Sequence, residues 1–157
     1  KSVCDAYNPT VYERYKAWAD DYFYLPHRNE TRGVGGIFFD HLVPENDIDS
    51  NKIFELCLAL GRNFPLIYMD QTSDVHSEAT QAQNDWQALR RSRYVEYNLL
   101  FDRGTKFGIV SNGRTESILL SMPPMATWKY NYVPKPDSEE EQTIERLKKH
   151  VDWISFL

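Results

Sequence analysis

The segment from Val95 to Val110 constrains the fold most, because a long apolar run carries charges near its middle. It reads VEYNLLF, then Asp102-Arg103-Gly104, then TKFGIV. Successive side chains of a strand alternate between two faces, and a glycine that follows polar residues is typical of a turn. We therefore predict a hairpin whose strands are Val95 to Phe101 and Lys106 to Val110. One face of the first strand should belong to the core and carries Val95, Tyr97, Leu99 and Phe101.

The charged centre of this segment has two interpretations. Asp102 and Arg103 form either a local ion pair in an ordinary turn or part of a polar ligand site. The second face of the predicted strand is polar at Glu96, Asn98 and Asp102, which fits solvent or a polar cavity. The residue pattern by itself leaves both interpretations open.

The rest of the chain mixes helical and extended patterns. A helix is expected from residue 11, where Thr10 can act as the N-cap, to Pro26, which ends it. Its core-facing side chains should be Val11, Tyr15, Trp18 and Tyr22. Further helices are expected at 51–64, 77–93 and 137–150. Ser50 can act as the N-cap of the first of these, and Pro65 can open another helical turn after it. Further strands are expected at 37–39 and 126–133. This mixture predicts an α+β fold in one domain.

Composition excludes several classes of protein. Hydrophobic residues make up 41% of the 157 residues and charged residues 26%, which is typical of a globular chain. A net charge of −5 argues against a general nucleic-acid binder, and no apolar run approaches the roughly 20 residues of a membrane span. Cys4 and Cys57 show no metal-binding spacing, and IFELCLAL predicts a buried thiol at Cys57 in a reducing compartment.

Three loops place arginine beside glycine or hydroxyl groups. Arg28 and Arg32 lie in HRNETRGVGG, Arg114 lies in SNGRTES, and Arg103 follows Asp102. Guanidinium groups bind carboxylates and phosphates through forked hydrogen bonds. The spacings of a dinucleotide fingerprint and of a P-loop are missing. The loops are therefore either plain surface loops with ion pairs or parts of a site for an acidic organic ligand.

Two long motifs resemble a known family. WADDYFYLPHRNETRGVGGIFFDHL and RYVEYNLLFDRGTKFGIVSNGRTESILLSMPPMATWKY closely resemble the oxygen-dependent coproporphyrinogen III oxidases. The resemblance implies an α+β fold that is part of a large antiparallel β-sheet flanked by helices on both faces. It also implies that residues 1–157 are the C-terminal portion of one oxidase domain, without the N-terminal half and its proton donor.

The same resemblance implies an activity. Two propionates of coproporphyrinogen III would become vinyls in haem biosynthesis, with O2 as co-substrate and with CO2 and H2O2 as products. No organic cofactor is implied, and the resemblance leaves open whether a divalent metal takes part. We expect a homodimer that binds no nucleic acid and does not span a membrane. We expect it in the cytoplasm, with mitochondria and plastids as alternative locations. The isolated chain should be inactive, and the alternative function is a non-catalytic dimerisation module.

Site residues follow from the resemblance position by position. Asp102 matches the family's aspartate beneath the pyrrole N–H groups, where its charge would stabilise positive charge on the reacting pyrrole. The implied substrate-binding residues are Gly113, Arg114, Thr115, Arg103, Arg32 and Asn98. The implied dimerisation residues are His27, Val95, Tyr97, Leu99 and Tyr130, and His27 also matches a histidine suggested as a metal ligand.

Overall fold

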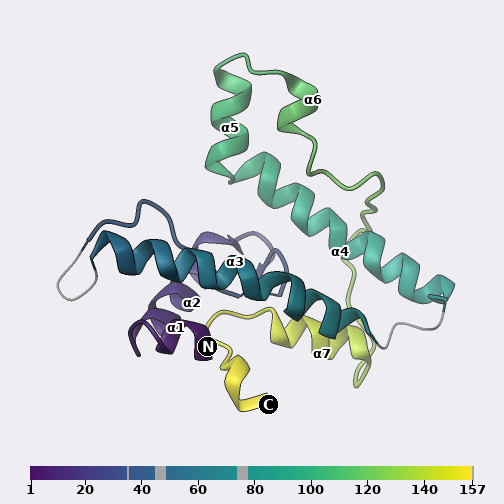
Figure 1. The fold of residues 1–157 in the computed structure, drawn as a ribbon. Helices are drawn as coiled ribbons and strands as arrows, with labels where there is room; N and C mark the ends of the chain where they lie inside the picture. Colours follow the sequence, from purple (N-terminus) through teal and green to yellow (C-terminus); the bar gives the residue numbers. More distant parts are fainter. Residues whose placement is uncertain (35, 45–48, 74–77, 157) are drawn as a thin grey trace. The chain divides into compact units, whose positions relative to one another are not determined.

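The protein is mostly helical in a computed structural model, which describes residues 1–34, 36–44, 49–73 and 78–156 (Figure 1). The α-helices are α1 (Ser2–Asp5), α2 (Val11–Tyr22), α3 (Ser50–Thr72), α4 (Gln81–Leu100), α5 (Arg103–Val110), α6 (Thr115–Ile118) and α7 (Glu139–Arg146), followed by a 3-10 helix, η1 (Trp153–Phe156). Two short strands, β1 (Tyr24–Leu25) and β2 (Glu30–Thr31), pair antiparallel.

The chain divides into two compact units. The first comprises Lys1–Ala19 and Gly36–Glu78, and the second comprises Asp20–Gly35 and Ala79–Leu157. The first unit has a small core, whose fully buried side chains are Cys4, Val11, Tyr15 and Leu56. The expected helix after Thr10 is confirmed as α2, although Trp18 is 36% exposed rather than buried.

Helix α3 differs from the expectation in three ways. Its N-cap is Asp49, not Ser50, because the Asp49 carboxylate accepts the Lys52 N–H at 2.9 Å. Pro65 lies inside the helix and does not open a separate one. Cys57 is exposed, so the predicted buried thiol is wrong. Leu56 occupies the core-facing position, and the next residue of a helix points about 100° away.

Helix α4 replaces the strand that was predicted at Val95 to Phe101. Its start carries a complete capping box between Thr80 and Gln83, which confirms a helix in this region. The helix then continues to Leu100, because buried side chains recur every four residues at Leu89, Arg93 and Tyr97. The predicted alternation is therefore wrong: Tyr97 is 2% exposed, whereas Leu99 is 46% exposed.

The remaining predicted strands are also wrong. Lys106 to Val110 belongs to helix α5, and residues 37–39 and 126–133 are irregular. Their backbones bond to helices instead: the Phe38 N–H donates to the Tyr15 carbonyl at 3.1 Å and the Thr127 N–H to the Ala88 carbonyl at 3.0 Å. The large antiparallel sheet is absent from the described ranges, which contain only the β1–β2 pair as a sheet.

The expected surface helix near the C-terminus is confirmed as α7. Ser138 is its N-cap, three glutamates occupy its first turn and Arg146 its last, as the helix dipole favours. Just beyond it, Leu147 is buried and its carbonyl accepts the Thr31 N–H of β2 at 2.8 Å. Within the described residues, each helix is too short or too polar to cross a lipid bilayer.

Candidate functional site

Asp102 lies at the junction of α4 and α5 and is the N-cap of α5. Its Oδ2 accepts the Thr105 N–H at 2.7 Å, and its own N–H donates to the Tyr97 carbonyl at 3.0 Å. This explains the charge inside an apolar run, because an N-cap needs an oxygen that accepts an orphan N–H. The junction holds the carboxylate in one orientation, half-buried rather than in a solvated turn.

The second oxygen of Asp102 faces aromatic rings. The Tyr22 hydroxyl donates to Oδ1 at 3.3 Å, and the Tyr22 ring meets the Tyr97 ring edge-on at 5.9 Å. Phe23 packs on Tyr97 at 5.4 Å. Burial raises the pKa of Tyr97, and the neighbouring Tyr22 and Asp102 raise it further. Tyr97 therefore keeps its proton at neutral pH.

Two arginines lie on the same aromatic cluster. The Arg32 guanidinium lies 4.1 Å from the centroid of the Phe23 ring and 5.5 Å from that of Tyr97, and Arg103 lies 5.1 Å from that of Tyr22. Burial lowers the pKa of Arg32, and the nearby tyrosines and Asp102 partly offset this decrease. The buried Nε of Arg32 has no hydrogen-bond partner among the described residues. The structure thus brings Asp102, Arg32 and Arg103 to one cluster.

Glu96 forms a second cluster, six residues before Asp102 in the chain. Its carboxylate accepts bonds from Arg28 at 2.6 and 2.9 Å and from the Trp128 indole at 2.9 Å. The Nε2 of His27 lies 2.8 Å from Oε2 of Glu96. Burial by itself would raise the pKa of Glu96, but the bonds from Arg28, His27 and Trp128 outweigh it and lower the pKa from 4.5 to about 2.

The loop of Gly113, Arg114 and Thr115 connects α5 to α6. Helix α6 runs back beside α5 (Figure 1). The loop lies at the far end of α5 from Asp102, roughly 12 Å away at 1.5 Å per residue. Arg114 is exposed, with Glu116 at 3.9 Å. The structure therefore does not place Arg114 in the Asp102 cluster.

The close approach of α5 and α6 depends on glycine, and we predict the effect of filling it. A Cβ on Gly113 would lie 3.0 Å from the Gly108 carbonyl oxygen and 3.3 Å from Ile118 Cδ1. Gly113→Ala should therefore destabilise the loop by about 1 to 3 kcal/mol, measured by urea unfolding. Gly33→Ala is the matched control, since nothing lies within 4 Å of its added carbon. Equal stability of both variants would contradict the packing argument.

The other predicted site residues lie elsewhere. The Asn98 amide donates to the Tyr94 carbonyl at 2.8 Å on its own helix. Of the predicted dimerisation residues, Tyr97 is buried within its unit and Val95 is half-buried, whereas Leu99, Tyr130 and His27 are exposed. The ranges described contain no group of three or more His, Cys, Asp or Glu side chains that could hold a metal ion.

Sequence reasoning missed Tyr22 and Glu96 as partners of the site. Tyr22 was read only as a core residue and Glu96 only as part of a polar strand face. The spacing of Arg93 and Glu96, three residues apart, is typical of an ion pair on a helix and is the signal that could have found the second cluster.

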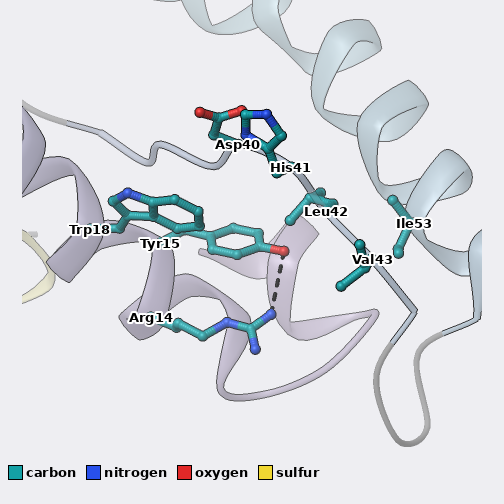
Figure 2. Close-up of a pocket in the computed structure, with 8 residues that line it drawn as sticks. All are labelled: Arg14, Tyr15, Trp18, Asp40, His41, Leu42, Val43 and Ile53. Carbon is teal, nitrogen blue, oxygen red and sulfur yellow. Dashed lines mark hydrogen bonds and ion pairs between the residues drawn. The ribbon is translucent and has the colours of Figure 1, made fainter. Parts of the chain in front are cut away.

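The first unit contains a cavity of about 240 Å³ (Figure 2). Tyr15 and Trp18 form one wall, with the Arg14 guanidinium 3.5 Å from the Tyr15 hydroxyl. The side chains of Asp40 and His41 pair at 2.5 Å at its edge. The cavity contains none of the predicted site residues, so the Asp102 cluster is the better candidate for function.

Fold and site define a mixed, mostly helical protein whose central aspartate lies among aromatic rings and guanidiniums. The family model described as Coproporphyrinogen III oxidase matches residues 1–153. The chain therefore belongs to the coproporphyrinogen III oxidase family.

Individual relatives agree with the family model. The chain is 48% identical to the oxygen-dependent coproporphyrinogen-III oxidase of Francisella tularensis subsp. holarctica (strain LVS) over 159 residues, which is 98% of this chain and 49% of the relative. It is 48% identical to the protein of the same name from Francisella philomiragia and 46% identical to that from Francisella tularensis subsp. novicida, with the same coverage. The chain thus spans about half the length of these relatives.

Proposed function

We propose that the chain provides the substrate-facing aspartate of an oxygen-dependent coproporphyrinogen III oxidase. The observation that carries the proposal is the carboxylate of Asp102, held at a helix junction by Thr105 and Tyr22 and bordered by Arg32 and Arg103. The family match and the printed names of the relatives supply the substrate.

The carboxylate suits the centre of a porphyrinogen. A carboxylate offers about four acceptor positions, and the bonds from Thr105 and Tyr22 use two of them. The remaining positions are available to the pyrrole N–H groups. Negative charge that is fixed before the reaction also stabilises positive charge that develops on an electron-rich pyrrole. Asp102 therefore binds the substrate and stabilises the transition state.

The reaction balances with oxygen as the sole oxidant. For each propionate, one C–H bond and the bond to the carboxylate carbon break, and the side chain becomes a vinyl. The propionate, one O2 and one proton give the vinyl, CO2 and H2O2. Arg32 and Arg103 would bind propionates that remain near the aromatic cluster. Arg114 would bind another from its exposed loop, and no step here uses a metal or an organic cofactor.

A chimera tests this proposal. The Francisella tularensis oxidase would carry this chain in place of the 159 residues that it matches. We expect the chimera to convert coproporphyrinogen III to protoporphyrinogen IX, and the isolated chain to show no turnover above background. Product is measured by fluorescence after oxidation to the porphyrin. An inactive but folded chimera, or an active isolated chain, would contradict the assignment of roles.

Substitution of Arg114 should mainly affect binding. Its side chain is about four-fifths exposed and lies about one helix length from Asp102, which fits a propionate clamp better than a charge at the reacting atoms. In the chimera, Arg114→Ala should weaken substrate binding by about 1.5 to 3 kcal/mol, with a raised KM and a smaller change in kcat. Lys135→Ala, another exposed cation of the same unit, should leave both constants unchanged. A lower kcat at constant KM would exclude the clamp.

The second candidate function is a non-catalytic dimerisation module in the cytoplasm. Exposed apolar side chains favour it, and between residues 99 and 130 they include Leu99, Phe107, Val110, Leu120 and Tyr130. Contiguous exposed apolar surface marks interaction sites. Light scattering of the chain would show a concentration-dependent dimer under either function, so only turnover by the chimera separates the two.

A further inference from the structure

A second cavity, of about 310 Å³, lies in the unit that contains Asp102. It is bordered by the turn between β1 and β2, by α4, by residues 132–134 and by α7. Three arginines, Arg28, Arg90 and Arg93, are among the residues that line the cavity. None of the residues of the Asp102 cluster lines it, so the cavity is separate from the proposed oxidase site.

The charges around this cavity do not cancel. Glu30 pairs with Arg90 at 2.9 Å and with Arg93 at 3.3 Å, and Glu96 pairs with Arg28 at 2.6 Å. Three guanidiniums thus face two carboxylates, which leaves one excess positive charge. Glu30 is 5% exposed and Arg93 is 7% exposed, so water screens this charge weakly.

An unsatisfied donor accompanies the excess charge. The Nη2 of Arg90 is buried and makes no hydrogen bond within the described part of the chain. The Nε of Arg93 also makes no hydrogen bond there, although Oε1 of Glu30 lies 3.3 Å away. Burial lowers the pKa of Arg93, and the charge of Arg28 lowers it further. A buried donor without an acceptor is costly, so an acceptor that carries negative charge would stabilise the cavity lining at Arg90.

The rest of the lining includes aromatic and aliphatic side chains. The rings of Trp86 and Tyr132 lie 5.9 Å apart, and Arg90 lies 5.6 Å from the centroid of the Trp86 ring. Leu89 is buried, and Ile144 of α7 is half-buried. Such a surface contributes hydrophobic contact and attracts flat or branched carbon groups. Inorganic anions gain nothing from it.

We propose that this cavity binds a small organic monocarboxylate. Its carboxylate lies at the side of Arg90 and Arg93, and its apolar body lies against the paired rings of Trp86 and Tyr132. The volume is at the small end of ligand pockets, so a single ring or a short branched chain fits. One negative charge matches the single excess positive charge. The site does not depend on the oxidase activity, because it shares no residue with the Asp102 cluster.

Nuclear magnetic resonance of the chain tests the proposal with 3-phenylpropionate as the probe. The four tryptophan indole N–H signals serve as reporters. The signal of Trp86 should shift and saturate, whereas that of Trp18, in the other unit, should not move. The uncharged 3-phenylpropionamide should bind at least about tenfold more weakly, and so should phosphate. Absence of a saturable Trp86 shift, or equal binding of phosphate, would overturn the proposal.

Two variants separate charge from shape. Arg90→Gln retains a donor for Glu30 but removes the excess charge, and it should weaken binding of 3-phenylpropionate about tenfold or more. Val133→Trp keeps every charge and fills the cavity from an exposed lining position, so it should abolish the Trp86 shift. Arg91→Gln, beside Arg90 but outside the lining, is the control and should bind like the parent chain. Unchanged binding by Val133→Trp would place the ligand elsewhere and refute the site.

Discussion

Asp102→Asn in the chimera should lower turnover of coproporphyrinogen III by roughly 10²-fold or more, the scale for removing one fixed electrostatic group. The substitution keeps the shape of the side chain. Asparagine is also a good N-cap, so its amide oxygen can still accept the Thr105 N–H that Asp102 accepts at 2.7 Å. The fold should therefore survive while the charge is lost. Measurement of kcat, KM and the melting temperature tests this directly.

A second N-cap aspartate provides the matched control. Asp49 caps α3 through the same kind of bond, to the Lys52 N–H at 2.9 Å. Asp49→Asn should leave both turnover and melting temperature close to those of the parent chimera. If Asp102 served only as a cap, the two variants would behave alike. Near-normal turnover for Asp102→Asn would therefore return this residue to a structural role.

Helix starts were the most predictable feature of this chain. The helix expected at 137–150 is α7, which begins at Glu139 after its N-cap Ser138, and α2 begins directly after Thr10. These signals are local, because a cap needs only an oxygen near the first N–H groups. The error at Ser50, where Asp49 is the cap, is one residue and is typical of helix boundaries.

Strands were the least predictable feature, and α4 shows why. VEYNLL alternates over six residues like a half-buried strand, but the twenty-residue helix from Gln81 includes it. The segment forms a helix and not a strand because Tyr97 packs on Tyr22 and Phe23, which come from a distant part of the chain. Tertiary packing of this kind overrides a short local pattern, and the residues near Val95 in the sequence do not indicate these contacts.

The candidate site was predictable in its residues but not in its partners. Asp102, Arg32 and Arg103 came from the resemblance, and the structure brings them to one aromatic cluster. The hydroxyl of Tyr22 could not be assigned to Asp102, because eighty positions separate the two residues. Arg114 was expected beside them, yet α5 carries it away. Because the sequence did not predict helix α5, it could not predict how far Arg114 lies from Asp102.

Glu96→Gln should destabilise the second unit strongly. Glu96 compensates the guanidinium of Arg28 and contributes to that of Arg93, which is 7% exposed. Removing the carboxylate charge weakens these charge-assisted bonds and leaves the guanidiniums partly uncompensated, at a cost of about 1.5 to 3 kcal/mol. Urea unfolding at pH 7, followed by circular dichroism, measures this loss. Glu145→Gln, an exposed glutamate on α7, is the control and should change little.

Glu96→Gln should also remove part of the pH dependence of the unfolding free energy. The pKa of Glu96 is about 2 in the folded protein, against an ordinary value of 4.5. Because the folded value is the lower one, the stabilisation from Glu96 is complete above about pH 4.5 and is lost as the pH falls toward 2. The unfolding free energies of the parent chain and Glu96→Gln should therefore differ at pH 7 and converge near pH 2. Parallel curves across this range would show that the Glu96 carboxylate is not held by Arg28, His27 and Trp128.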